Sequence, residues 1–272
     1  MSGSLPAKAI LHQRQLSLFS MICHLQSDPL NRRARQALTR CKPSEKSWFT
    51  QIRDICLLYG LPHPLILLQQ PLSKHEFKKL SRSLIIDHWE QKFRLETSPL
   101  TSLIFFKPEF HSLCSPHPIY LTAGPNPYEV AKAVVQSKML SGRYRTEQLA
   151  RHWSSNKNGF CLAPTCHEVV ESLEHILLWC PSYQLTREKL KKLWLNTDTD
   201  SPHTSQLLTT ILYGSSDSMM QFLLDASTHP MVIKLSQTYG SEILKIIFHL
   251  TRSWCFSIHM QRAKLLGRWH AT

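Results

Sequence analysis

Glycine is scarce in this chain, with only 8 among 272 residues. Folds that bring the backbone close to phosphates, such as P-loop and dinucleotide-binding enzymes, need glycine at the points of approach, so both classes are disfavoured. The sequence also lacks Gly-x-Ser-x-Gly, His-Glu-x-x-His and Walker-type motifs, and it has no Asp-Asp pair of the kind that two-metal polymerases and nucleases use. We therefore expect a protein without enzymatic activity.

Long hydrophobic runs are absent too. A spanning helix needs about 20 apolar residues, and the best stretch, residues 57–68, is interrupted by Gly60, Pro62 and Pro64. The first residues show no apolar segment typical of a signal peptide. We expect an intracellular protein, in the nucleus, the cytoplasm or both, with no membrane partner. In a reducing compartment, the eight cysteines would serve as thiols or metal ligands.

Acidic residues are few in comparison with basic ones. The chain has 32 Lys and Arg against 19 Asp and Glu, which gives a formal net charge of +13. A surplus of this size favours an anionic partner such as nucleic acid, although a merely soluble basic protein is the alternative. Because 42% of the residues are apolar, the chain can form a core and does not read as a disordered basic tail.

Helical periodicity dominates and predicts a mainly α fold. We expect helices in residues 1–96, a proline-rich irregular connection in 97–127, basic helices with a metal module in 128–196, and further helices in 197–272. One helix should begin with a capping box at Ser73 and Glu76. The last apolar pattern predicts a single long helix over residues 230–269.

Three cysteines and one histidine form the strongest chemical signal. Their spacing is Cys-x4-Cys-x8-His-x4-Cys, and the residues are Cys161, Cys166, His175 and Cys180. A tetrahedral zinc ion takes thiolates and imidazoles from two such pairs, and four protein ligands leave no open position, so we predict a structural Zn²⁺.

The flanks of the motif suggest how its second half folds. We expect a short helix over residues 168–179, and Pro181 disfavours helical geometry at Cys180, which must leave that helix. Two alternatives stay open: His167 in place of His175 as the imidazole ligand, and a chance spacing without metal.

Basic residues gather in two places, one within the first helical half and one directly before the cysteine motif. Arginine forks match phosphate geometry, and aromatic side chains among them can stack on unpaired bases. The candidate nucleic-acid-binding residues are Arg32, Arg33 and Arg35 in the first cluster, and Arg143, Tyr144, Arg145, Arg151, Trp153 and Lys157 in the second. For each cluster alone, a solvated helix face is the alternative.

Several segments point to a family. Residues 5–18, 47–53, 139–146 and 151–154, together with the cysteine motif, resemble the region that follows the polymerase palm in non-LTR (LINE-type) retrotransposon reverse transcriptases. The resemblance implies a helical thumb-like region over residues 1–96, and then the Cys-Cys-His-Cys zinc motif of that family. It also implies target-primed reverse transcription, in which element RNA is copied onto a nicked chromosomal end.

The match to that family is partial, because the aspartate-bearing palm and the endonuclease domain have no counterpart here. The resemblance therefore implies a non-catalytic fragment that binds template RNA, target DNA or both, with the missing palm of the same element as a partner. A zinc-stapled interaction protein without nucleic-acid binding, or a non-functional remnant of an element, is the alternative.

Overall fold

The computed structural model describes residues 4–25, 28–40, 42, 46–155, 157–196 and 202–267. Within these residues the fold is mainly α, as predicted. The backbone pairing between extended segments is an isolated antiparallel bridge of Phe160 with Val170. None of the described helices is both long enough and apolar enough to cross a membrane.

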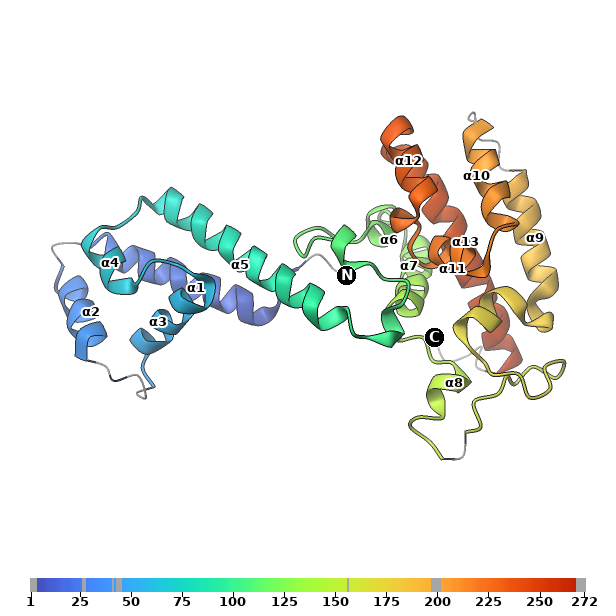
Figure 1. Cartoon of the computed structure of the whole chain (residues 1–272), viewed down its shortest axis with the longest axis horizontal. Coiled ribbons are helices and arrows are strands. Elements are labelled where there is room, and N and C mark those ends of the chain that lie inside the picture. Colours follow the sequence, from blue (N-terminus) through green and yellow to red (C-terminus); the bar gives the residue numbers. More distant parts are fainter. Residues whose placement is uncertain are drawn as a thin grey trace. The chain divides into compact units, whose positions relative to one another are not determined.

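The chain divides into two compact units, whose helices are labelled in Figure 1. We call Gly3–Ser98 with Ser112–Ser115 the N-terminal unit. The C-terminal unit comprises Pro99–His111 and the described residues from Pro116 onward. The finer division of the second half into a connection, a metal module and a final helical region stays a prediction.

Five of the described helices build the N-terminal unit, and local chemistry sets their ends. The predicted capping box is present: Ser73 Oγ accepts from Glu76 N at 3.2 Å, and Glu76 Oε2 accepts from Ser73 N at 3.1 Å. Gly60 ends a helix in the left-handed region, with φ of 67°. The helices are α1 (Ala7–Cys23), α2 (Pro29–Arg40), α3 (Trp48–Tyr59), α4 (Pro64–Gln69) and α5 (Lys74–Thr97).

An apolar cluster forms the core of this unit. Leu16 and Phe19 of α1 are fully buried with Ile52, Leu68 and Ile85 from the other helices. Burial of such side chains contributes about 1.5–3 kcal/mol each. The N-terminal unit is therefore stabilised mainly by hydrophobic packing.

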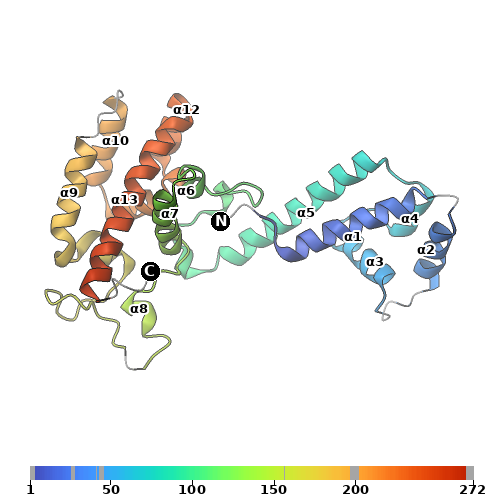
Figure 2. The same ribbon diagram turned by 180° about the vertical axis from the view of Figure 1, so that it is seen from behind.

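Eight of the described α-helices belong to the C-terminal unit. α7 and α13 lie side by side, as Figures 1 and 2 both show. The helices are α6 (Pro118–Leu121), α7 (Pro127–Leu140), α8 (Glu147–Ala150), α9 (Gln184–Leu195), α10 (Pro202–Leu212), α11 (Ser216–Asp225), α12 (Pro230–Tyr239) and α13 (Ser241–Leu265). Short single turns are η1 (Thr101–Leu103), η2 (Pro108–Phe110), η3 (His175–Trp179), η4 (Pro181–Tyr183) and η5 (Ala226–Thr228).

The prediction of one helix over residues 230–269 is wrong. Gly240 separates α12 from α13 with φ of 75° and ψ of −165°, a conformation that other residues rarely adopt. Residues 268 and 269 lie outside the described residues.

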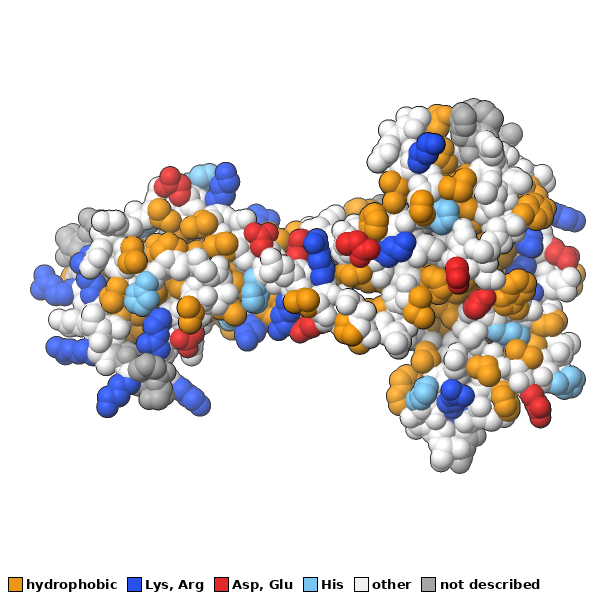
Figure 3. Space-filling model, in the orientation of Figure 1, with side chains coloured by type: hydrophobic (Ala, Val, Ile, Leu, Met, Phe, Trp, Pro, Cys, Tyr) orange, Lys and Arg blue, Asp and Glu red, His pale blue; other side chains and the backbone are white. Residues whose placement is uncertain are grey.

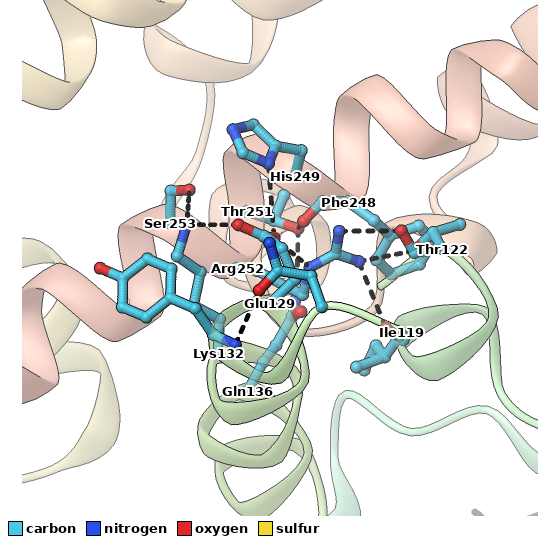
Figure 4. A network of polar contacts seen from close by, with 12 residues as sticks. Ile119, Thr122, Glu129, Lys132, Gln136, Phe248, His249, Thr251, Arg252 and Ser253 are labelled. Carbon is cyan, nitrogen blue, oxygen red and sulfur yellow. Dashed lines mark hydrogen bonds and ion pairs between the residues drawn. The ribbon is translucent and has the colours of Figure 1, made fainter. Parts of the chain in front are cut away.

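A buried arginine joins three helices of the C-terminal unit (Figure 4). Arg252 of α13 donates to the carbonyl of Ile119 at 3.2 Å and to the hydroxyl and carbonyl of Thr122 at 2.6 and 3.1 Å. Its Nε lies 3.5 Å from Glu129 Oε2 on α7. This network fixes α6 and α7 against α13, so the unit depends on polar contacts as well as on apolar packing.

Candidate metal centre

The structure brings the four predicted ligands together in one buried cluster. One ligand atom of each residue lies within 4.8 Å of the others, in Cys161, Cys166, His175 and Cys180. Cys180 Sγ is 3.6 Å from Cys166 Sγ and 3.9 Å from Cys161 Sγ. These separations are far longer than the bond of about 2.05 Å in a disulfide, so the cysteines are free thiols brought to metal-binding distance.

The first half of the site is a tight loop closed by backbone hydrogen bonds. Cys161 N donates to Val169 O at 2.8 Å, and Glu171 N donates to Gly159 O at 2.9 Å. The helix predicted over residues 168–179 does not begin at Glu168, which has a positive φ of 55°. The β-branched pair that follows Glu168 favours extended backbone and carries the antiparallel bridge, so that part of the prediction is wrong.

The second half of the site is the π-helix η3. Cys180 N donates to His175 O at 2.7 Å, so the turn closes over five residues instead of four. Cys180 then takes φ of −58° and ψ of 119°, outside helical geometry, ahead of Pro181. The predicted departure of Cys180 from the helix is confirmed, and the wide turn is what brings it back beside His175.

The donor set fits a tetrahedral cation. Zinc–sulfur bonds of about 2.3 Å give a tetrahedral edge of about 3.8 Å between two thiolates, close to both measured separations. His175 Nε2 is buried and has no hydrogen-bond partner among the described residues. An orphaned buried nitrogen is costly unless a ligand such as a metal ion satisfies it. His167, the alternative imidazole, is exposed and lies outside the cluster.

Burial determines the protonation of the ligands before a cation binds. Burial raises the pKa of the Cys161 thiol to about 12 and also raises the pKa of Cys180, while burial lowers the pKa of His175. Without metal, Cys161 and Cys180 are therefore held as thiols and His175 as a neutral imidazole. A divalent ion would have to displace thiol protons, so its affinity must rise with pH.

A buried arginine lies against the third cysteine. Arg187 Nη2 donates to Cys180 O at 2.7 Å, while its Nη1 is buried without a partner among the described residues. Burial lowers the pKa of Arg187, and the nearby Cys180 opposes that shift. A positive charge is thus kept next to thiols that are neutral until a metal binds.

Glu171 ties the metal loop to the basic residues that precede it. Its Oε1 accepts from Glu147 N at 2.8 Å and from Arg262 Nη2 of α13 at 2.6 Å. Glu147 in turn pairs with Lys157 Nζ at 2.9 Å. We call residues 143–157 the basic segment. The carboxylate of Glu171, which belongs to the metal loop, anchors this segment through the backbone N–H of Glu147.

The candidate residues of the basic segment fall into two groups. Arg143, Arg145 and Arg151 are exposed, and Trp153 is 75% exposed. Tyr144 is buried, and the Arg262 guanidinium lies over its ring at 5.6 Å, so it is not an exposed stacking platform on the surface. Lys157 is half-buried and engaged with Glu147.

The other candidates lie on α2 in the N-terminal unit. Arg32 and Arg33 are exposed, and Figure 3 shows Lys and Arg side chains around this helix. Arg35 is half-buried, and it donates to Asn31 Oδ1 at 2.9 Å and to Leu68 O at 2.7 Å. Its guanidinium joins α2 to α4 and is not free for a phosphate.

A second cluster has no signature in the sequence, because Asp225 lies more than a hundred residues after the two histidines that it meets. Asp225 Oδ2 lies 2.8 Å from His111 Nε2 and 3.4 Å from His117 Nε2, and Ser227 donates to Oδ1 at 2.6 Å. Because His117 Nδ1 accepts from Ile119 N, a neutral His117 carries its proton on Nε2 and faces Asp225 as a donor.

The tautomer makes this second cluster a hydrogen-bonded group and a poor metal site. A metal-bound imidazole usually donates its other N–H to an acceptor, and here that nitrogen meets a backbone donor. Burial would raise the pKa of Asp225, but hydrogen bonds from His111 and His117 outweigh burial and lower it below its ordinary value. Asp225 therefore remains an ionised carboxylate inside the unit.

Comparison of the chain with protein-family models, with curated proteins and with solved structures found no match.

Proposed function

We propose that this chain binds nucleic acid through the basic segment, which a structural zinc site positions, and that it performs no catalysis itself. One observation carries the proposal. The carboxylate of Glu171, in the loop between the metal ligands, accepts from the backbone of the basic segment and from α13. The segment has only the four-residue helix α8 within its described residues, so its shape depends on such anchors.

Zinc is the metal that suits three thiolates and one imidazole in a closed tetrahedral site. Bound Zn²⁺ with three thiolates carries a net charge of −1, and Arg187 supplies the compensating positive charge beside Cys180. Four protein ligands leave no position for a substrate, so the ion would stabilise the loop and activate no water.

Exposed arginines and an exposed tryptophan favour a nucleic-acid partner. Guanidinium groups bind phosphates in bidentate fashion, and an exposed indole can stack on an unpaired base. Arg143, Arg145 and Arg151 have no ion-pair partner among the described residues, so they are available to phosphates. Arg32 and Arg33 of the N-terminal unit are available in the same way.

The resemblance of several sequence segments also suggests which larger protein the chain comes from. We propose that the chain is the post-palm part of a LINE-type reverse transcriptase, acting on template RNA or target DNA together with a separate polymerase palm. This step rests on the sequence segments and on the spacing of the metal ligands.

Salt dependence of binding tests the nucleic-acid proposal. The full zinc-loaded chain would be titrated into labelled single-stranded and duplex RNA and DNA at rising salt, and binding followed by fluorescence anisotropy. We compare the triple variant Arg143→Gln, Arg145→Gln and Arg151→Gln with a control of equal charge change, Lys78→Gln, Lys79→Gln and Arg82→Gln on α5.

The basic-segment variant should bind at least about tenfold more weakly. Its slope of log K against log salt should become shallower by about 0.9 for each duplex DNA phosphate that the variant no longer neutralises. The control should change the affinity less than threefold. Equal weakening in both variants would contradict the placement of the binding site on the basic segment. Affinity that does not depend on salt would instead favour a zinc-stapled interaction protein.

The role of Arg187 tests the zinc assignment separately. Outer-shell partners of metal ligands typically contribute 10- to 100-fold to metal affinity. Chelator competition should therefore show an Arg187→Met chain that binds zinc about tenfold more weakly, with Arg187→Lys between it and the original chain. Unchanged affinity in both variants would contradict a metal-linked role for Arg187.

A further inference from the structure

A cavity of about 320 Å³ opens in the C-terminal unit beside the basic segment. Its lining is largely apolar and includes Met139, Leu140 and Leu224, all buried. Ile104 and Phe105, which follow η1, also line the cavity, and so does Leu149 of α8, which is half-buried. Cavities of this size suit a small ligand or a single inserted group.

The cavity also has unused polar groups. Gln148 and His152 line it, and neither side chain has a hydrogen-bond partner among the described residues. Within the same part of the chain, no Asp or Glu lines the cavity. A purely aliphatic ligand would displace water from the half-buried Gln148 and the exposed His152 without replacing its hydrogen bonds, whereas a heterocycle with donors and acceptors along its edge would replace them.

The chain beside the cavity carries free positive charge. Gly142, Tyr144 and Thr146 line it, and the residues that alternate with them, Arg143 and Arg145, are exposed. An apolar slot with polar groups at one side, next to guanidinium groups, complements the flat base and the charged backbone of a nucleotide strand.

We infer that this cavity receives one unpaired nucleobase of a bound single strand. The inference rests on the proposed nucleic-acid binding and specifies it. The base packs among the apolar side chains that line the cavity, its edge meets Gln148 and His152, and the flanking phosphates contact Arg143 and Arg145. Because a paired base cannot enter, the segment prefers single strands or frayed ends over intact duplex.

A double-mutant cycle that combines variants of the protein with abasic oligonucleotides tests the pocket directly. The zinc-loaded full chain would bind a short single-stranded oligonucleotide, and a series of oligonucleotides with one abasic position moved along the strand. The pocket variant is Gln148→Ala with His152→Ala, and the matched control is Gln36→Ala with His75→Ala in the N-terminal unit, both exposed. Zinc content and circular dichroism verify that each variant is folded.

With the original chain and the control, one abasic position should weaken binding about tenfold. The pocket variant should bind the intact strand about tenfold more weakly and lose less than twofold on removal of that base. A further variant, Ile104→Trp at a side chain that is 73% exposed, should block the cavity and behave like the pocket variant.

Salt-dependent binding that is indifferent to every abasic position, or that weakens equally in all variants, would overturn the pocket while leaving the proposed function intact. Failure of any strand to bind would overturn both.

Discussion

The two units bury different kinds of side chain. Among the described residues, the buried Lys, Arg, Asp and Glu side chains all belong to the C-terminal unit: Lys132, Glu147, Glu171, Arg187, Asp225, Arg252 and Arg262. The N-terminal unit buries an apolar cluster with a few neutral polar groups, such as Asn31 and Thr50. A buried charge is costly unless it is paired, so the C-terminal unit must preserve many specific contacts.

This difference parallels the way each unit presents its basic residues. Arg32 and Arg33 stand on the face of α2, which backbone hydrogen bonds shape. Arg143 and Arg145 stand on irregular chain, where Glu171 and the metal loop supply the anchoring. Irregular backbone can place side chains in combinations that a helix face cannot, provided that charged contacts fix it.

Removal of the metal should produce the largest difference in stability between the two units. A Cys161→Ser, Cys180→Ser chain, or the original chain with a chelator, should lose stability only in the C-terminal unit, on the order of 5 kcal/mol or more. Hydrogen exchange should show reduced protection around η3 and the basic segment, and unchanged protection in α1 and α5. A uniform reduction across both units would contradict the account.

Loss of Arg252 should have the next largest effect on stability. Arg252→Met removes one of the cations beside Glu129, which keeps Lys132 at 2.7 Å, and orphans the carbonyls of Ile119 and Thr122. The change should cost about 3 kcal/mol in the C-terminal unit. Denaturant unfolding measures this value. Arg33→Met in the N-terminal unit is the matched control, with an expected change below about 0.5 kcal/mol.

The ionised carboxylate of Asp225 predicts that the stability of the C-terminal unit depends on pH. Its pKa in the folded chain is lower than in the unfolded chain, so the ionised carboxylate contributes stability above its ordinary pKa of about 3.9, and this contribution is lost as the pH falls below it. Asp225→Asn should therefore cost about 2 kcal/mol at pH 7 and progressively less towards pH 3. A constant difference across that range would contradict an ionised Asp225.

The smallest effect is expected in the N-terminal unit. Tyr59 Oη lies 2.8 Å from His12 Nδ1 and accepts from Trp89 Nε1 at 2.9 Å. Tyr59→Phe should cost about 1 kcal/mol by thermal unfolding, because apolar packing persists. A destabilisation as large as that of Arg252→Met would show that this unit also depends on polar contacts.

Sequence patterns predict what local rules determine. The capping box at Ser73 and the exit of Cys180 from its helix follow from neighbouring residues, and both are confirmed. The pattern predicts helix through Gly240 because apolar residues continue at helical spacing on both sides of it. The burial of Tyr144 and the hydrogen bond of Arg35 to Leu68 depend on partners far along the chain. So does the meeting of Asp225 with its two histidines.

The metal site likewise combines features that neighbouring residues determine with features that depend on the rest of the fold. The spacing of the three cysteines and His175 predicts the cluster, since its pairs are close in sequence. Neither the anchor from Glu171 to Arg262 nor the charge of Arg187 beside Cys180 has a local signal. The sequence therefore indicates the ligands, and only the structure indicates what the site supports.

The absorption spectrum of the cobalt-substituted chain tests the central claim most directly. A closed site of three thiolates and one imidazole predicts one tightly bound ion per chain, with intense visible bands of tetrahedral cobalt and thiolate charge-transfer bands in the near ultraviolet, and stoichiometric displacement by zinc. A weak octahedral spectrum, or bands that persist in the Cys161→Ser, Cys180→Ser chain, would contradict it.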